Sequence, residues 1–307
     1  MKIKTLFILL ITFSIVQQGY AQKNNKVENV VLQLSINEKI DLLCAKFPGV
    51  QKQGLVKYDW WSECLHGVAR AGKATVFPKP IAMGATWDSD LIKRIADAIS
   101  DEARAKHQRE VEQNGFSDRH FGLTFFSPTL NIARDPRWGR TSECFSEDPL
   151  LTSDMGVAFI KGMQGDDPYY LKTVATAKHF VANNEEDRRL GGSAEVDEMS
   201  LREYYFPAFQ AAVTQGRVTS IMGAYNALNG IPCCANSFLL NDVLRNEWGF
   251  DGVVISDGSA IDKLYTHHKY VPSLENGAAM ALKAGCDMSL RDEYRKGLYL
   301  AYQQGMI

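Results

Sequence analysis

Residues 252–257 read GVVISD, an apolar run that ends in a carboxylate, Asp257. A short run of this kind, without alternation of apolar and polar residues, is typical of a strand buried on both faces of a parallel sheet. Taken alone, an Asp just past a strand is more often a turn or helix N-cap residue than a reactive group. The stretch therefore predicts a parallel sheet and leaves the role of Asp257 to be decided by its neighbours.

Similar apolar runs recur along the chain and alternate with helical patterns. Further strands are expected at 123–126, 174–177, 218–224 and 287–290, and helices at 35–47, 91–103, 151–162, 198–215, 240–249 and 274–283. This alternation predicts an α/β fold, either a (β/α)8 TIM-like barrel or an open doubly wound sheet. No glycine-rich phosphate loop follows any of the strands, and its absence favours the barrel.

Polar side chains stand where several of these strands end. Lys178 and His179 follow one strand, Tyr225 follows the next, and Asp257 ends the third. A barrel places its active site at the carboxyl ends of its strands, so these side chains are expected to converge on one pocket. Arg140, with the doublet 188–189, adds bidentate hydrogen-bond donors.

The composition of this predicted pocket favours carbohydrate chemistry. Trp60 and Trp61 lie beside Glu63, and an aromatic ring can pack against the C–H face of a sugar, although core packing is an equally good interpretation of the two rings. The six His are scattered without metal-ligand spacing, and no Ser lies in a GxSxG elbow. Carboxylate chemistry supported by Lys, His and Arg donors then points to glycosyl transfer to water.

The bulk properties narrow the class of protein. Residues 1–21 have the layout of a secretory signal peptide, which predicts export to the periplasm or medium, with a retained membrane anchor as the alternative. A formal net charge of −2 argues against nucleic acid as a partner. The six Cys lack zinc-site spacing, and buried thiols are favoured over disulfides.

Five motifs together resemble glycoside hydrolase family 3, in the branch that holds β-xylosidases and β-glucosidases. They occur in the family's order, at residues 58–67 (YDWWSECLHG), 133–140 (ARDPRWGR), 178–180 (KHF), 221–226 (IMGAYN) and 254–257 (VISD). The resemblance implies a barrel domain over residues 22–307 and no cofactor or metal. It implies an oligosaccharide or aryl β-glycoside as substrate, while the sugar (xylose, glucose or arabinose) and the oligomeric state stay open.

The resemblance also implies roles for individual residues. Asp257 matches the catalytic nucleophile of a retaining mechanism, and the residues that match the sugar-binding set are Glu63, Arg140, Lys178, His179, Arg189 and Tyr225. Arg189 fits the family's offset from the KHF motif better than Arg188 does. Lys178, His179 and Arg140 are expected to favour the ionised form of Asp257.

Two departures from the family's pattern shape the expectation. The second carboxylate, the acid/base, comes in most of the family from an α/β sandwich domain after the barrel, so the chain is expected to be truncated at its C-terminal end. Gly258 stands where many relatives carry a bulkier residue, often Trp or Cys.

Two rival interpretations remain. The N-acetylhexosaminidase branch is disfavoured because its catalytic loop does not follow the KHF motif here, where residues 181–184 read VANN. A truncated barrel that is inactive, or that binds glycans without cleaving them, is the alternative to an enzyme.

Overall fold

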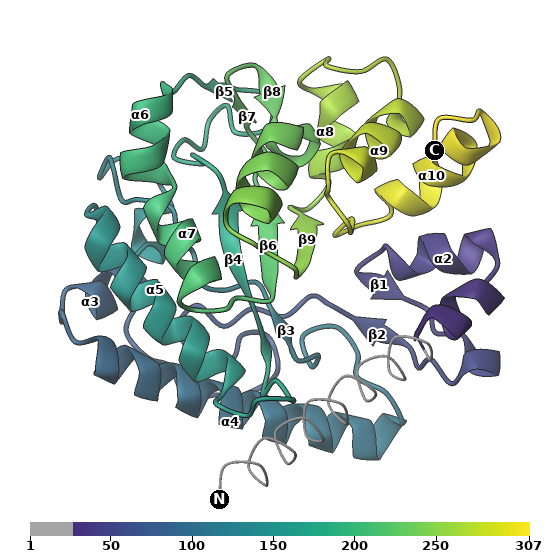
Figure 1. The fold of residues 1–307 in the computed structure, drawn as a ribbon. Helices are drawn as coiled ribbons and strands as arrows, with labels where there is room; N and C mark the ends of the chain where they lie inside the picture. Colours follow the sequence, from purple (N-terminus) through teal and green to yellow (C-terminus); the bar gives the residue numbers. More distant parts are fainter. Residues whose placement is uncertain (1–26) are drawn as a thin grey trace, which may run out of the picture.

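A parallel four-stranded sheet lies at the centre of the molecule (Figure 1). The computed structural model describes residues 27–307. The sheet has the order β3 (Thr124–Phe125), β4 (Val174–Phe180), β6 (Ser220–Gly223) and β9 (Val253–Ser256). Almost every residue of these strands is buried, as expected for apolar runs covered on both faces. The strands predicted at 123–126, 174–177, 218–224 and 252–256 are confirmed as β3, β4, β6 and β9. The strand expected at 287–290 is present only as isolated bridges at Met288 and Ser289.

Backbone hydrogen bonds carry this sheet round into a closed ring. Residues 287–289 pair with β9 through a parallel bridge between Ile255 and Met288, and with the segment before β1 through a second bridge between Cys44 and Ser289. Two further hydrogen bonds link this segment to the end of β3: Trp60 N–H donates to Ala45 O, and Phe126 N–H donates to Ser62 O. The TIM-like α/β fold expected from the sequence is therefore confirmed.

One part of the ring departs from a regular (β/α)8 pattern. β1 (Lys46–Phe47) and β2 (Tyr58–Asp59) run antiparallel to each other. Parallel neighbours need a crossover of a dozen or more residues, and the segment between these two strands is too short for one. It holds only a 3₁₀ turn, η1 (Gln51–Gln53). The helix expected over 35–47 accordingly ends early, because Lys46 and Phe47 belong to β1.

Apolar side chains from different parts of the ring fill its interior. The cluster joins Phe126, Met222, Ile255 and Met288, with Trp60 and Trp61 packed against it. These residues come from segments far apart in the sequence, and they pack together in one cluster. A filled interior of this kind is the packed core of a barrel rather than one face of an open sheet.

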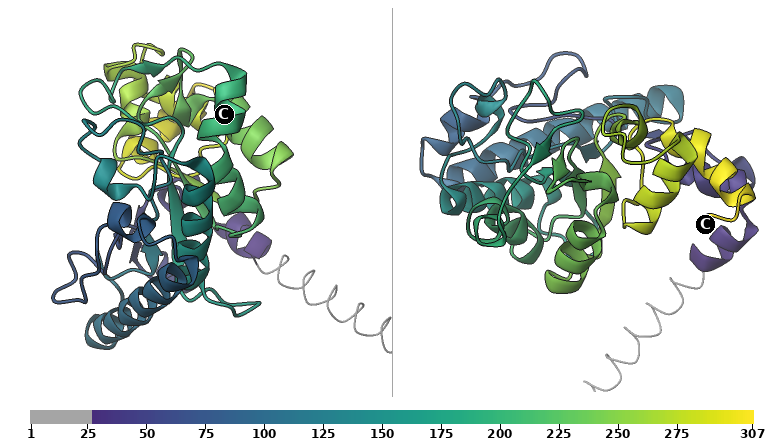
Figure 2. Two further views of the ribbon diagram at one scale, coloured as in Figure 1. Left: turned by 90° about the vertical axis from the view of Figure 1, so that its left-hand side faces the viewer. Right: turned by 90° about the horizontal axis from the view of Figure 1, so that it is seen from above.

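Helices surround the ring: α5 and α7 pack against β4, and α4 packs against α5 (Figures 1 and 2). Pro207 divides the helix expected over 198–215, because proline lacks the N–H that a continuous helix needs there. The helices are α2 (Ile36–Leu42), α3 (Pro80–Gly84), α4 (Ser89–Asn114), α5 (Pro149–Gln164), α6 (Glu198–Ser200), α7 (Pro207–Thr214), α8 (Ala260–Thr266), α9 (Leu274–Lys283) and α10 (Glu293–Gln303), with π-helical η3 (Leu201–Tyr205) and η5 (Phe238–Glu247) and 3₁₀ turns η2 (Thr141–Glu143) and η4 (Cys233–Ala235).

The remaining strands form a small sheet beside the ring. It has the order β5 (Ser193–Ala194), β7 (Ala227–Leu228) and β8 (Ile231–Pro232).

All six cysteines are buried free thiols, as favoured from the sequence. The predicted signal peptide, residues 1–21, lies outside the described residues. No helix within residues 27–307 is long and apolar enough to cross a membrane.

Candidate active site

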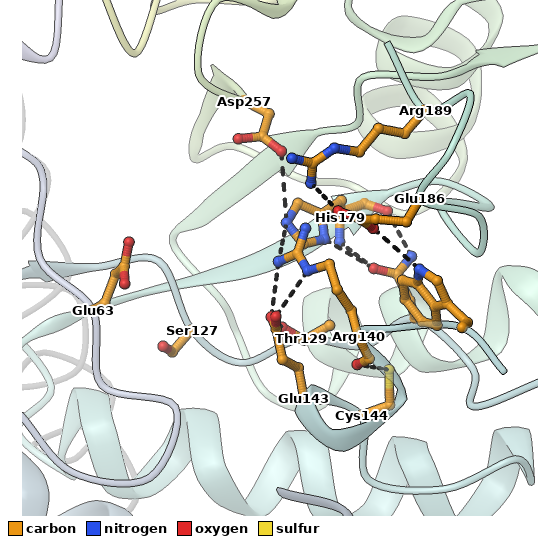
Figure 3. A network of polar contacts seen from close by, with 12 residues as sticks. Glu63, Ser127, Thr129, Arg140, Glu143, Cys144, His179, Glu186, Arg189 and Asp257 are labelled. Atoms are coloured by element: carbon orange, nitrogen blue, oxygen red, sulfur yellow. Dashed lines mark hydrogen bonds and ion pairs between the residues drawn. The ribbon is translucent and has the colours of Figure 1, made fainter. Parts of the chain in front are cut away.

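The residues predicted to form the site line one small cavity of about 210 Å³. Apolar side chains of the barrel interior, including Phe126 and Met222, also line it. The polar lining residues come from loops and strand ends across the ring, and they include every predicted site residue: Glu63, Arg140, Lys178, His179, Arg189, Tyr225 and Asp257. Figure 3 labels Glu63, Arg140, His179, Arg189 and Asp257 among them. Arg188 does not line this cavity; its side chain is 79% exposed and pairs with Glu185.

Asp257 follows β9 directly and is fixed at both its backbone and its carboxylate. Its N–H donates to Gly223 O at 3.1 Å, and its Oδ1 accepts from Gly258 N–H at 2.7 Å. Its Oδ2 lies 3.6 Å from His179 Nε2. Burial raises the pKa of Asp257, and this outweighs the opposing effects of the Gly258 hydrogen bond and of the nearby Lys and Arg cations. The hydrogen bonds thus fix the Asp257 carboxylate beside the cavity, while burial makes its ionised form less stable.

His179 is held as a neutral ring. Its side chain is 2% exposed, and Nε2 lies 3.2 Å from Arg140 Nη2, which can only donate. Nδ1 lies 3.0 Å from Asn131 Oδ1, so the proton is assigned to Nδ1. Burial, with Arg140 next, holds the pKa of His179 well below its usual value. His179 therefore adds no positive charge beside Asp257, in contrast to the expectation from the sequence.

Arg140 is oriented by Glu143, which the sequence analysis did not identify. Nε and Nη2 of Arg140 donate to Oε1 and Oε2 of Glu143, each at 2.8 Å, a bidentate pair (Figure 3). Burial raises the pKa of Glu143, but the hydrogen bonds and charge of Arg140 outweigh burial, and the net shift is downward. Glu143 lies three positions after Arg140, and this i, i+3 spacing of opposite charges was the signal in the sequence that could have identified the pair.

Arg189 is held by a second acidic residue that the sequence analysis missed. Its Nη1 lies 2.6 Å from Glu186 Oε1, and Oε2 of Glu186 accepts from the indole N–H of Trp138 at 3.2 Å. The guanidinium lies 5.2 Å from the ring centroid of Tyr225. Glu186 thus orients the Arg of the doublet that lines the cavity.

The other polar lining residues are Lys178, Glu63 and Tyr225. Lys178 is buried, and burial followed by the charge of Arg140 lowers its pKa. Glu63 accepts from the indole N–H of Trp61 at 3.0 Å. The Tyr225 hydroxyl donates to Gly258 O rather than to the Asp257 carboxylate. Burial and, second, the negative charge of Asp257 raise the pKa of Tyr225, so the Tyr225 hydroxyl remains a neutral donor.

A family model for the glycosyl hydrolase family 3 N-terminal domain matches residues 23–307. The chain belongs to glycoside hydrolase family 3. A probable exo-1,4-beta-xylosidase of Aspergillus terreus is 39% identical over 302 residues, which cover 92% of this chain and 38% of the relative. A xylan 1,4-beta-xylosidase of Xylanibacter ruminicola is 38% identical over 87% of this chain and 32% of its own length.

Solved structures of family 3 members share the fold. An exo-beta-xylosidase, XlnD, in complex with a xylobiose aziridine activity-based probe superposes with a TM-score of 0.84 at 33% identity, covering 93% of this chain and 38% of XlnD. The Bifidobacterium adolescentis GH3 beta-glucosidase gives 0.73 at 31% identity, covering 90% of this chain and 37% of its own. The chain thus spans about 38% of the length of the first relatives it matches.

Proposed function

We propose that the protein hydrolyses terminal, non-reducing β-D-glycosidic bonds of β-xylosides or β-glucosides with retention of configuration. Asp257 is the proposed nucleophile. The observation that carries this proposal is the convergence of Asp257 with six hydrogen-bonding side chains on one cavity. A volume of about 210 Å³ is below that of drug-sized pockets and suits a single sugar ring, hence cleavage at a chain end.

In the first step, an Asp257 oxygen attacks the anomeric carbon while the bond to the leaving oxygen breaks. The product is a glycosyl ester on Asp257, which water cleaves in the second step. Oδ2 is the proposed attacking oxygen, because Oδ1 accepts the Gly258 N–H. Charge-assisted donors such as Arg140, Lys178 and Arg189 are proposed to bind the sugar hydroxyls, with Glu63 accepting from one of them.

The leaving oxygen needs a proton from a carboxylic acid about 5 Å from the nucleophile. Glu143 does not suit this role, because its lowered pKa keeps it ionised at neutral pH and both its oxygens are bound to Arg140. We propose that the acid is supplied from outside the described residues. We also propose export to the periplasm or medium, where such a hydrolase would act in carbohydrate catabolism.

The experiment is Asp257→Gly, assayed by nitrophenol release across a panel of aryl β-glycosides. Removal of a nucleophile is expected to lower kcat about 10⁴-fold or more, with partial rescue by azide as an external nucleophile. Asp251→Gly, an exposed position two residues before the same strand begins, is the matched control and should keep activity. Wild-type turnover in Asp257→Gly would overturn the assignment, and sugar binding without turnover in the wild type would favour a glycan-binding protein.

A further inference from the structure

A second pocket of about 300 Å³ adjoins the candidate active site. Most of its lining residues follow one of two parallel neighbours: Ser259 and Asp262 follow β9, and residues 290–293 with Lys296 follow the closing segment 287–289. The pocket therefore opens at the same edge of the ring as Asp257. Leu290 lines both cavities. A group bonded to the anomeric oxygen of a sugar at Asp257 would have this second pocket beside it.

Arg291 stands at the boundary between the two pockets. A Cβ placed on Gly258 would lie 3.2 Å from Tyr225 Oη and 3.7 Å from Arg291 Nε. Arg291 therefore fills the space next to the residue after the nucleophile, and Gly258 leaves room for it. The guanidinium lies 5.2 Å from the ring centroid of Trp61, a residue of the active-site cavity.

Most of the basic residues that line the second pocket form no ion pair with a carboxylate of residues 27–307. Four basic residues line it, namely Lys46, Arg119, Arg291 and Lys296. Within residues 27–307, only Arg119 among them has a carboxylate within 4.0 Å, through Nε to Asp59 at 3.1 Å. The Arg119 guanidinium also lies 5.0 Å from the Trp61 ring, so two guanidinium groups flank one indole.

The acidic residues of the pocket do not cancel this charge. Asp292 is bound by Arg295, and Asp262 by Lys263 at 3.1 Å. Glu293 is 5% exposed, and burial raises its pKa, which disfavours its ionised form. The unpaired charge in the pocket is thus positive, carried by Lys46, Arg291 and Lys296.

We infer that this second pocket binds a carboxylate on the leaving-group side of the substrate, such as a uronic acid branch, through Arg291. A carboxylate matches the fork of a guanidinium, and Lys46 and Lys296 add attraction at short range. The inference rests on the proposed function, because it takes the neighbouring cavity as the site of the terminal sugar.

The test compares two aryl β-glycosides of the preferred sugar, 4-nitrophenyl and 3-carboxy-4-nitrophenyl. The ratio of their kcat/KM values is expected to favour the carboxylated substrate and to fall about tenfold in Arg291→Gln, the loss of one charge-assisted hydrogen bond. The preference should weaken at high salt. Arg109→Gln, an exposed residue of α4, should leave the ratio unchanged. Equal ratios in the wild type and Arg291→Gln would overturn the inference.

Binding of D-glucuronate by Asp257→Asn, followed by titration calorimetry, tests the pocket without catalysis. Binding that weakens in Asp257→Asn with Arg291→Gln, but not with Arg109→Gln, supports the pocket. If no glycoside is cleaved but this dependence holds, the proposed function fails and the pocket stands. Glucuronate affinity that is independent of Arg291 rules the pocket out.

Discussion

The charge on Asp257 is a balance between burial and the cations around it. Burial raises the pKa of Asp257, and Lys178 is the first of the charged groups that oppose this rise. A nucleophilic carboxylate must be ionised, so activity should be lost as the pH falls through this raised pKa. The acid limb of the pH–rate profile should lie above the ordinary pKa of an Asp.

Lys178→Met should move the acid limb of kcat/KM to higher pH, because it removes a cation that lowers the pKa of Asp257. The position of the limb is the readout, since Lys178 is also expected to bind sugar and its loss will lower the maximum rate. Lys161→Met, an exposed change on α5, is the control. An acid limb that stays in place or moves to lower pH would contradict this account of the charge balance.

The two members of the arginine doublet should behave differently when changed. Arg189→Gln removes a cavity cation held by Glu186 and should lower kcat/KM by about 10- to 100-fold, the range for hydrogen bonds to charged groups. Arg188→Gln changes an exposed pair with Glu185 and should have little effect. Steady-state kinetics on one aryl glycoside compares the two, and equal losses would refute the distinction.

At the scale of single residues, the sequence predicted the side chains that face the cavity better than those behind them. Asp257 and Tyr225 could be predicted because each comes just after a strand that reads clearly as buried, and Lys178 because it follows the apolar part of β4, which continues to Phe180. Asn131 and Glu186 could not, because they lie in irregular segments and act through another residue. The neutral state of His179 depends on burial and on Arg140, 39 positions away, which no local pattern reveals.

At the scale of elements, the close approach of α4 and α5 depends on a glycine. A Cβ on Gly162 would lie 2.4 Å from Lys93 O and 2.7 Å from the Ala96 Cβ, both on α4. Gly156, on the same helix, would meet Leu130 Cδ2 at 2.5 Å, the end of a flexible side chain. One glycine faces backbone that cannot yield, and the other faces a side chain that can.

Gly162→Ala should therefore unfold more easily than Gly156→Ala. Both changes gain the same helix propensity, so the difference in their free energies of unfolding isolates the cost of overpacking, about 1–3 kcal/mol. Urea denaturation followed by circular dichroism measures it. Equal free energies would mean that α4 can move away from α5 at little cost.

The sequence patterns predicted the bounds of a helix best where no long-range strand pairing competed with the helix. The helix expected over 274–283 agrees with α9 (Leu274–Lys283), which begins at a Ser273 cap. The helix expected to reach residue 47 instead ends at Leu42, because β1 pairs with β2. Strand pairing is a non-local interaction, and it prevailed over the helical pattern.

At the scale of the molecule, the two ends of the described chain meet. α2 and α10 pack together (Figure 1), and Arg295 Nε donates to Asp41 Oδ1 at 2.6 Å. Ser289 N–H donates to Leu43 O, while Ala45 N–H donates to Ser289 O, each at 2.9 Å. Closure of the ring thus depends on segments that are distant in sequence.

A chain shortened to end at Gly285 should lose cooperative unfolding, because it exposes the edges of β9 and of residues 43–45. Thermal denaturation followed by circular dichroism measures this. A chain that ends at Gln303 keeps the closing segment and α10, and it should unfold as the parent does. Cooperative unfolding of the shorter chain at the parent's temperature would show that the ring does not need its last segment.

The Cys44–Ser289 bridge also has a consequence for biosynthesis. These residues are 245 positions apart, and a ribosome adding 5–20 residues per second needs roughly 12–50 s to make the chain between them. β3, β4, β6 and β9 emerge in order and can pair as they appear, whereas residues 43–45 must wait for Ser289, their partner on the other side, until the end of synthesis. Nascent chains should therefore hold a formed sheet with two open edges, and a chaperone that protects the residue 43–62 segment would act during that wait.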